Sequence, residues 1–504
     1  MFMKNTQVKL FFQLPNPFGG CVWIVVWLLS HPIFAQNNET KVKSDGRPWN
    51  LQECIEFAQS NSIPVKQSQI QAQISENNYI QSKYGRLPSV NFNHQQNLQG
   101  GRSIDPFSNQ FVNQLVNSSN TSLVASFNAF SGFQQSNTIR RNELNVEVNQ
   151  LNREQQKYNV ALNVALNYLQ VLQNYELLDV ARKQTEVTKA QLERTQKLFD
   201  AGAVAIGNLA NLQAQLANDE LAVIQAENNL QISKVNLMQQ MNYPINEMNE
   251  NFDIVKVDLG DVEVVDYPQN PAEIYAIAEM SQPNIQSADL GIRVSQYNVD
   301  IAKAGRYPTL TLTATLSSGF SSARALSQTS VALQQQVIGT VDGTGQTVST
   351  LTPVVTRTAT PYPVFRQYDD NFAQVVGFRL GIPIFNGLQV KTNIRNSMLG
   401  VENAKLTAQN NRIILRQTIE QAFVNADLAA NTYKAQQKQV EGLSLAFEIA
   451  QKNFEAGAIN SFDYSIAKTN LDRARANLIS AKYNYLFRTE VLDFYQNLPL
   501  TIGD

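Results

Sequence analysis

The sequence predicts an α+β membrane protein in which three chains close a 12-stranded β-barrel, with four strands from each chain. The barrel is expected to continue as a long α-helical coiled-coil tunnel in the periplasm. Three observations lead to this fold class. The sequence is internally duplicated, each copy contains two strands with one apolar face, and each copy contains a helical segment of unusual length. Any one of these features would fit several folds, but the combination is restrictive.

The duplication appears in short phrases that recur at fixed offsets. The phrase GRLPSV at 85–90 returns as GRYPTL at 305–310, and FDAGA at 199–203 returns as FEAGA at 454–458. Recurrence at a fixed period indicates a repeated architecture. The offset rises from 220 (305 − 85) to 255 (454 − 199), so the second copy contains a longer insertion after residue 308. We expect a signal peptide at 1–35, a first repeat at 36–243, a linker at 244–271 and a second repeat at 272–504.

The first 35 residues have the pattern of a secretory signal. Lys4 and Lys9 precede the apolar stretch Cys21–Leu29, and Ala35 is a small residue before the expected cut. An uncleaved membrane anchor is the alternative, although the stretch is short for one. Lipidation of Cys21 is a second alternative, but the apolar stretch follows that cysteine instead of preceding it.

Four segments alternate between apolar and polar residues, as strands with one apolar face do. The clearest is Thr309–Leu316, where threonines alternate with leucine and alanine, and Val376–Ile384 has the same period. In the first copy, Leu123–Ala129 alternates in the same way, and Val90 with Phe92 forms a weaker version. A soluble antiparallel sheet with one buried face would show the same pattern.

Helical segments surround these strands. Ile63–Lys83 and Gln282–Ala304 are expected to be helices that end at a Gly-Arg-x-Pro element, because proline stops a helix. Gly132–Asp200 and Gly387–Glu455 contain no proline and would be on the order of 100 Å long as helices. Apolar residues spaced four and three apart give coiled-coil stripes. They are Leu144, Val148, Leu151, Tyr158, Leu162, Leu166 and Leu169 in one helix, Leu209, Leu212, Leu216, Val223, Ala226 and Leu230 in the next, and Ala467, Leu471, Ala474, Leu478, Ala481 and Tyr485 in the last.

Four strands cannot close a barrel, and lipid does not tolerate open strand edges. No apolar run after residue 35 reaches the roughly 20 residues that a membrane helix needs. Chains must therefore pool their strands if the protein spans a membrane. Two chains would give eight strands, a barrel whose interior is filled by side chains. Three chains give twelve strands, which begins to leave a water-filled lumen.

Composition gives no sign of an enzyme or of a cofactor site. With 40 basic and 42 acidic residues, the chain has no charge excess that would favour nucleic acid. After removal of the signal only Cys54 and His94 remain of their types, which excludes a disulfide framework and a histidine-based zinc site. No nucleophile with its base, no phosphate loop and no paired-carboxylate motif stands out. We therefore expect no catalytic residues, no cofactor and no metal.

The sequence resembles the TolC-like outer-membrane efflux proteins, also called outer membrane factors. The resemblance rests on the doubled plan, on the phrases at 198–210 (LFDAGAVAIGNLA) and 453–465 (NFEAGAINSFDYS), and on the opening at 49–55 (WNLQECI), and it covers about residues 48–498. It implies a homotrimer in the outer membrane of a Gram-negative bacterium, extending into the periplasm. The linker Tyr243–Pro271 and the termini would form a belt around the helices.

The same resemblance implies a function and its partners. The chain would be a passive export duct for small molecules or drugs, embedded in outer-membrane lipid and driven by an inner-membrane transporter through a periplasmic adaptor protein. Type I protein secretion and metal efflux use the same fold and stay open as alternatives, because the difference lies in the partner pump. A coiled-coil envelope scaffold that transports nothing is an alternative from another class.

Two sets of site residues follow from the resemblance. The periplasmic entrance would include Asp463, Asn208, Phe454, Ile459 and Ile466, and the adaptor would dock on the turns at Gly202, Ala203, Val204, Gly457, Ala458 and Ile459. Asp463 has an equally good structural explanation, because an acid in a first helical turn complements the helix dipole. Asn208 holds the matching position in the first copy, and Ile466 stands where a second acid is common in relatives. Phe454, Ile459 and Gly207 replace polar groups that help to bond the entrance shut in such relatives. We therefore expect packing, and not hydrogen bonding, to hold a closed entrance together.

The long insertion in the second copy spans Gly319–Tyr368. It contains Gly343, Gly345, several prolines and many Ser and Thr residues, without a clear period. Its place between two strands predicts an extracellular loop, because outer-membrane barrels have their longer loops outside.

Overall fold

The computed structural model describes residues 11–14, 22–25, 47–105, 107, 109, 111–244, 252–257, 260, 262–264 and 267–500. They belong to two compact units. The strand unit comprises residues 1–38, 84–135 and 304–387, and the helical unit comprises 39–83, 136–303 and 388–504. Most of the predicted signal peptide lies outside the described residues. Its described parts, β1 (Phe11–Leu14) and β2 (Val22–Val25), pair with each other.

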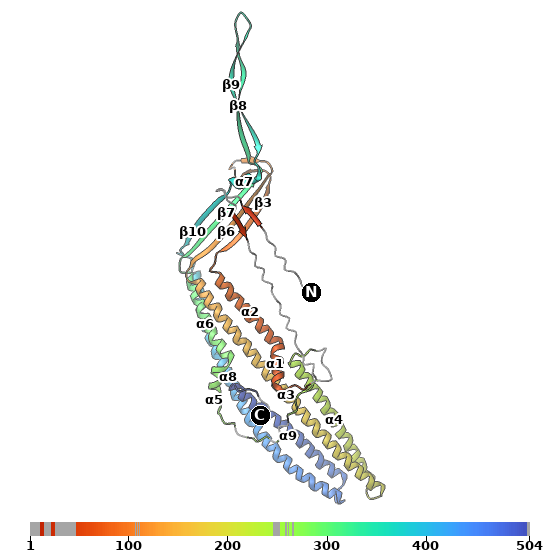
Figure 1. Cartoon of the computed structure of the whole chain (residues 1–504). Coiled ribbons are helices and arrows are strands. Elements are labelled where there is room, and N and C mark those ends of the chain that lie inside the picture. Colours follow the sequence, from red (N-terminus) through yellow and green to blue (C-terminus); the bar gives the residue numbers. More distant parts are fainter. Residues whose placement is uncertain are drawn as a thin grey trace. The chain divides into compact units, whose positions relative to one another are not determined.

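The strand unit contains a four-stranded antiparallel sheet in the order β10-β7-β6-β3, seen in Figure 1. Its strands are β3 (Ser89–Gln99), β6 (Val116–Ser131), β7 (Thr309–Ser321) and β10 (Ala373–Gly381). All four predicted strands are therefore confirmed, although β10 ends before Ile384. Each copy of the repeat contributes two strands, and the two copies meet where β6 pairs with β7.

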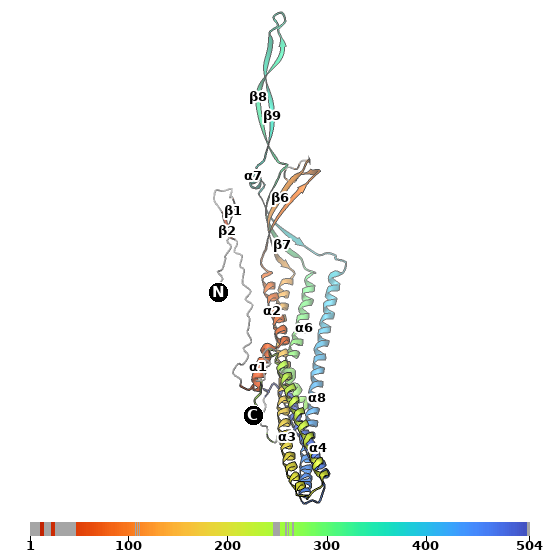
Figure 2. The same cartoon turned by 90° about the vertical axis from the view of Figure 1, so that its right-hand side faces the viewer.

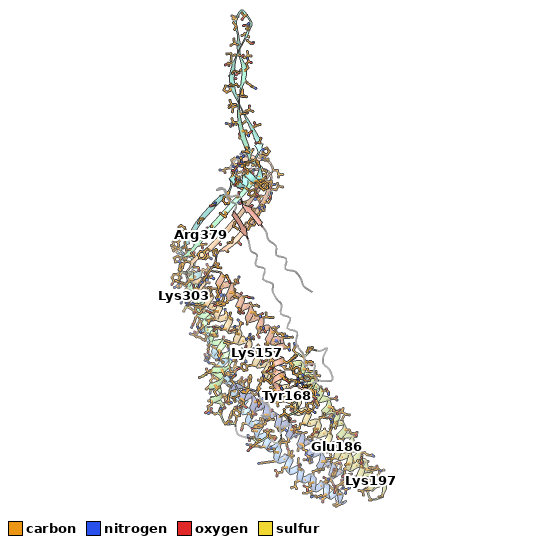
Figure 3. The ribbon with its side chains drawn as sticks, in the orientation of Figure 1. Lys157, Tyr168, Glu186, Lys197, Lys303 and Arg379 are labelled. Atoms are coloured by element: carbon orange, nitrogen blue, oxygen red, sulfur yellow. The ribbon has the colours of Figure 1, made fainter. Side chains whose placement is uncertain are left out.

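The two faces of this sheet differ in chemistry. Along one lateral row, Phe92 of β3 pairs with Leu123, and Leu123 pairs with Leu316. The face that contains this row also carries Val90, Leu312, Val376, Phe378 and Leu380. The opposite face carries mainly amide and hydroxyl side chains, with Arg379 of β10, labelled in Figure 3, as its charged residue in the four paired strands. Both faces are largely open to solvent in the single chain.

The insertion is more regular than expected. Residues 325–361 form a long hairpin of β8 (Ala325–Thr340) and β9 (Thr347–Pro361), and Gly343 and Gly345 both have positive φ in its turn. No strand was predicted here, because the Thr, Ser and Gln residues mask the alternation, and the extracellular placement stays a prediction. A shorter pair, β4 (Arg102–Ile104) with β5 (Phe111–Asn113), lies in the corresponding loop of the first copy.

A short helix, α7 (Val364–Asp370), fastens the base of the hairpin to the sheet. The Gln367 side chain donates to the Ser321 carbonyl at 3.1 Å and accepts from the Ser321 amide at 3.0 Å. The Tyr368 hydroxyl contacts Ser119, and the Asn371 side chain donates to the Gly319 carbonyl at 2.7 Å. A Cβ at Gly319 would lie 2.1 Å from the Ser119 carbonyl oxygen, so only glycine allows this close approach.

The helical unit shows the duplication in its element lengths. Each helix has a counterpart of equal length: 11, 22, 67 and 35 residues in both copies. At 67 residues each long helix is about 100 Å long. The first copy contains α1 (Leu51–Asn61), α2 (Ile63–Tyr84), α3 (Gln134–Asp200) and α4 (Ile206–Gln240), and the second contains α5 (Pro271–Ser281), α6 (Pro283–Ala304), α8 (Gln389–Glu455) and α9 (Ser461–Tyr495).

The short helices α1 and α5 were not predicted, although the sequence carries a signal for both. Asn50 and Glu53 form a capping box at the start of α1, and Asn270 and Glu273 form the same box at the start of α5. An Asn followed three residues later by Glu is a recognisable helix start. The second box has Pro271 at the first helical position, which strengthens the signal.

The predicted stripes form much of the helical core. Leu212 and Leu471 are buried, as are Leu144, Leu169 and Leu230. Leu166 is an exception, since 42% of its surface is exposed while its neighbours Val164 and Tyr168 are buried. In the middle of α3 the predicted apolar stripe is therefore shifted by one residue from the residues that are buried: it contains Leu166, whereas Ala165 is buried.

The described part of the linker packs on the helices. Trp49 forms a parallel bridge with Ile254: its amide donates to the Asp253 carbonyl and its carbonyl accepts from the Val255 amide, both at 2.9 Å. The Tyr168 hydroxyl donates to the Val255 carbonyl at 3.0 Å. Trp49 also contacts the rings of Phe57, Tyr243 and Phe252. The belt around the helices stays a prediction, because it would need several chains.

Candidate functional site at the helix turns

The site residues expected from the sequence lie at the turns that join α3 to α4 and α8 to α9. Lys197, labelled in Figure 3, lies in the last turn of α3. Gly202 has φ +72° and Gly457 has φ +74°, the left-handed conformation that ends a helix. The Ala203 amide donates to the Leu198 carbonyl, and the Ala458 amide donates to the Asn453 carbonyl, both at 2.8 Å. The two turns therefore share one backbone motif, and glycine is required in both.

The helices that follow the turns start differently. The Asn460 side chain caps α9 by accepting from the amides of Phe462 and Asp463, both at 2.9 Å. The Ala205 side chain gives α4 no such cap. Asp463 lies in the first turn of α9 with its side chain exposed, where its charge complements the helix dipole. This position fits the dipole explanation, and the carboxylate is open to solvent in the single chain.

A polar contact joins the two helical hairpins close to the turns. The Ser461 hydroxyl donates to Asn208 Oδ1 at 3.0 Å, and the Asn211 side chain donates to the Ser461 hydroxyl at 3.1 Å. Asn208 was expected at the entrance, whereas Ser461 and Asn211 were not singled out. The sequence carries no signal for this contact, because the repeat offset of 255 matches Asn208 with Asp463 and not with Ser461. The contact holds α4 and α9 of one chain together.

Some apolar side chains at the turns are packed against neighbours, and others are exposed to solvent. Phe454 is half-buried and stacks on Tyr464, with ring centroids 5.1 Å apart. Val204 and Ile459, expected as apolar contact surface, are also only partly exposed. Ile466 is more open, and the largest exposed apolar surface at the turns comes from Ile206 (69%) and Phe462 (59%), which the sequence analysis missed. Ala203 and Ala458 are exposed as expected.

A buried charge cluster lies deeper in the helical unit, between α4 and α9. Lys468 is 2% exposed, and its Nζ lies 2.8 Å from Asp219 Oδ2 and 2.6 Å from Asp472 Oδ2. Thr188 of α3 also donates to Asp219 at 2.5 Å. Burial raises the pKa of Asp472 above its ordinary value, although the neighbouring Lys468 acts in the opposite direction. The ion pair between Lys468 and Asp219 therefore connects the hairpin α8–α9 to the hairpin α3–α4.

A cleft of about 490 Å³ adjoins this cluster. It lies among α3, α8 and α9, and its walls include Gln184, Phe447, Lys468 and Asp472. Tyr464, nearby on α9, is buried, and burial raises the pKa of its hydroxyl to about 12. In the described residues the Gln184 side-chain nitrogen and the Tyr464 hydroxyl have no hydrogen-bond partner.

In the described residues, no group of three or more His, Cys, Asp or Glu side chains could hold a metal ion. Among the helices in that part of the chain, none combines the length and hydropathy needed to cross a membrane.

The chain matches a known family over both copies. The family model described as outer membrane efflux protein matches residues 54–242 and 274–495. The chain is 24% identical over 333 residues to the outer membrane protein TolC of Escherichia coli, a match that covers 64% of this chain and 58% of that relative. It is 19% identical to the outer membrane efflux protein BepC of Brucella suis, over 72% of this chain and 68% of the relative.

Solved structures share the fold. The CmeC outer membrane channel of Campylobacter jejuni superposes with a TM-score of 0.67 at 18% identity, covering 90% of this chain and 87% of that one. VceC of Vibrio cholerae gives a TM-score of 0.67 at 12% identity, covering 90% and 97%. These likenesses confirm the fold of long helices with a four-stranded sheet in each chain. The chain belongs to the outer membrane efflux protein family, whose members are non-enzymatic proteins of the outer membrane of Gram-negative bacteria.

Proposed function

We propose that this chain is the outer-membrane duct of a tripartite efflux system. Three copies would close a 12-stranded barrel and a helical tunnel, and a periplasmic adaptor would connect the tunnel to an inner-membrane transporter. Small molecules are the expected cargo. The matched span is 58% of the length of the TolC relative from Escherichia coli, and the proposal does not depend on that relative's cargo.

The observation that carries this proposal is the amphipathic sheet with two open edges. Its apolar face is exposed in the single chain, including Phe92 (69%) and Phe378 (76%). Lipid would cover such a face, whereas the opposite face of amide and hydroxyl groups suits a water-filled lumen. The edge strands β3 and β10 have no further partner within the sheet.

The strand order specifies how copies would join. The strands alternate in direction across the sheet, so β3 and β10 run in opposite directions. Strand β10 of one copy can therefore pair antiparallel with β3 of the next, which satisfies every backbone group. Three four-stranded sheets joined in this way make a closed ring of twelve strands.

Single-channel recording in a planar bilayer tests the proposal. Purified protein should give discrete conductance steps, because a closed ring has a water-filled lumen. A non-transporting scaffold would give none, and that result would reject the duct. The recording also tests Asp463 as an entrance residue: Asp463→Asn should reduce the preference for cations if three copies of this exposed acid line the entrance. Unchanged selectivity would leave Asp463 with only its role in the helix dipole.

A further inference from the structure

The hairpin β8–β9 has one apolar face that the single chain leaves uncovered. The cross-strand pairs Val331 with Val355 and Leu333 with Pro353 place these residues on one face. Leu351 and Val337 lie on the same face, opposite Gln335 and Ser349. The other face is mostly Gln, Thr and Ser, in pairs such as Gln334 with Thr352. The hairpin is therefore amphipathic over residues 331–337 and 349–355.

The apolar side chains of this face are open to water. Val331, Leu333 and Val337 are 60–63% exposed, and Leu351 is 61% exposed. Strands β8 and β9 form a sheet of only two strands, and they extend beyond the four-stranded sheet (Figures 1 and 2). A two-stranded hairpin is marginally stable by itself, and an exposed apolar patch of this kind marks an interaction surface.

The charge of the hairpin indicates what can cover it. Between Ala325 and Pro361 the charged residues are Asp342, in the turn, and Arg357. Natural proteins protect exposed strands with charges, especially lysine, and this hairpin has almost none. Arg357 pairs with Thr329 and lies on the apolar face towards the base of the hairpin, whereas residues 331–337 and 349–355 carry no charge, so two hairpins can approach each other there without charge repulsion. The composition therefore favours contact between identical copies.

The place of the hairpin in the chain would put the hairpins of neighbouring copies close together in the proposed trimer. The hairpin is inserted between β7 and β10, and α7 fixes its base to β6 and β7 by hydrogen bonds through Gln367 and Tyr368. In the trimer proposed above, β10 pairs with β3 of the next copy, so three hairpins would rise from one ring. Pro353 has no N–H and weakens β9 as a template for strand addition, which favours packing through faces.

We propose that the three hairpins of a trimer pack with their apolar faces together outside the barrel, so that the occupant of each face is the hairpin of another copy. This inference rests on the proposed trimer. The Gln and Thr faces then point outward to water. The insertion serves as an additional trimer contact, and not as a free loop.

Matched cysteine variants test this contact. Leu333→Cys lies on the apolar face and Gln334→Cys, its neighbour in sequence, lies on the polar face. Both are made in a Cys54→Ala background, and purified trimers are treated with a mild oxidant and analysed on a denaturing gel. We expect disulfide-linked dimers for Leu333→Cys and loss of that product for Gln334→Cys. Cross-linking of neither variant, or of both equally, in protein of trimeric mass would overturn the contact.

The mass of the untreated protein keeps this result separate from the proposed function. A monomeric mass would reject the trimer itself, and with it the contact between hairpins. A second variant pair provides a readout that does not depend on disulfide geometry. Leu333→Asp should lower the temperature at which trimers dissociate, whereas Gln334→Asp should leave it unchanged. Equal effects of the two aspartates would again contradict packing through the apolar face.

Discussion

Among single residues, the buried lysine Lys468 is expected to contribute strongly to the stability of the helical unit. It forms ion pairs with Asp219 and Asp472, which come from different helices and are themselves largely buried. Charges removed from water are costly unless they are paired and hydrogen-bonded. Thr188 and Gln215 supply hydrogen bonds to Asp219 and complete this pairing.

Replacement of the lysine alone should be strongly destabilising. Lys468→Met leaves two buried carboxylates without their cation, which costs on the order of 3–5 kcal/mol. The triple variant Lys468→Met, Asp219→Asn, Asp472→Asn removes all three charges and should recover most of this loss. Denaturant unfolding followed by circular dichroism measures both. If the triple variant were as unstable as the single one, the cluster would act through packing and not through charge.

The raised pKa of Asp472 predicts a pH dependence. The folded protein binds this proton more tightly than the unfolded chain does, so the contribution of Asp472 to stability falls as pH rises from below 3.8 through the raised pKa. The stability of the native protein relative to Asp472→Asn should therefore decrease over that interval. Thermal unfolding of both proteins at pH 3.5, 5 and 7 (about the relevant range) measures the difference. A difference that grows with pH would have the wrong sign.

At the scale of elements, the two turns differ from their surroundings by being small and exposed. A Cβ at Gly202 or Gly457 would meet nothing within 4 Å, so each turn has free space around it. Ile206 and Phe462, just beyond the turns, add exposed apolar surface. Such surface at the end of a helical hairpin fits a docking site for another helical protein.

Docking at the turns can be blocked without changing the backbone. Ala203→Glu and Ala458→Glu keep both glycines and place a charge on exposed positions. We expect export of a dye from whole cells to be lost while trimers still form and insert. Ala222→Glu, at an exposed alanine within α4, is the matched control and should export normally. Normal export by the two turn variants would show that no partner docks there.

The elements also show how far the sequence could predict the structure. The separation of 70 residues from Gly132 to Gly202 is repeated from Gly387 to Gly457. It predicted a long helix of equal length in each copy, and both have 67 residues. The turn glycines were predicted because only glycine adopts their φ without strain. The contact of Asn208 with Ser461 could not be predicted, because these residues are 253 positions apart and meet only through the packing of the two helical hairpins. The hairpin β8–β9 was missed because threonine occurs on either face of a strand.

For the whole molecule, membership of the family supports two expectations from the sequence: outer-membrane localisation and the absence of enzymatic activity. The chain is an outer-membrane protein of a Gram-negative bacterium and not an enzyme, as its family shows. The family and the fold also agree with the duplicated plan read from the sequence. Assembly into a trimer, the adaptor and the transporter stay predictions for this chain, and all of them depend on whether the open sheet edges join.

Cross-linking between the edge strands tests the proposed barrel most directly. Asn91→Cys on β3 is combined in turn with Val375→Cys, Gly377→Cys or Arg379→Cys on β10. All four positions lie on the polar face, and three positions on β10 allow for the unknown register between copies. We expect one combination to give covalent trimers on a denaturing gel, with each single variant giving none. Only monomers from all three combinations, in protein that binds detergent and remains folded, would contradict a barrel closed by β3 and β10 of neighbouring copies.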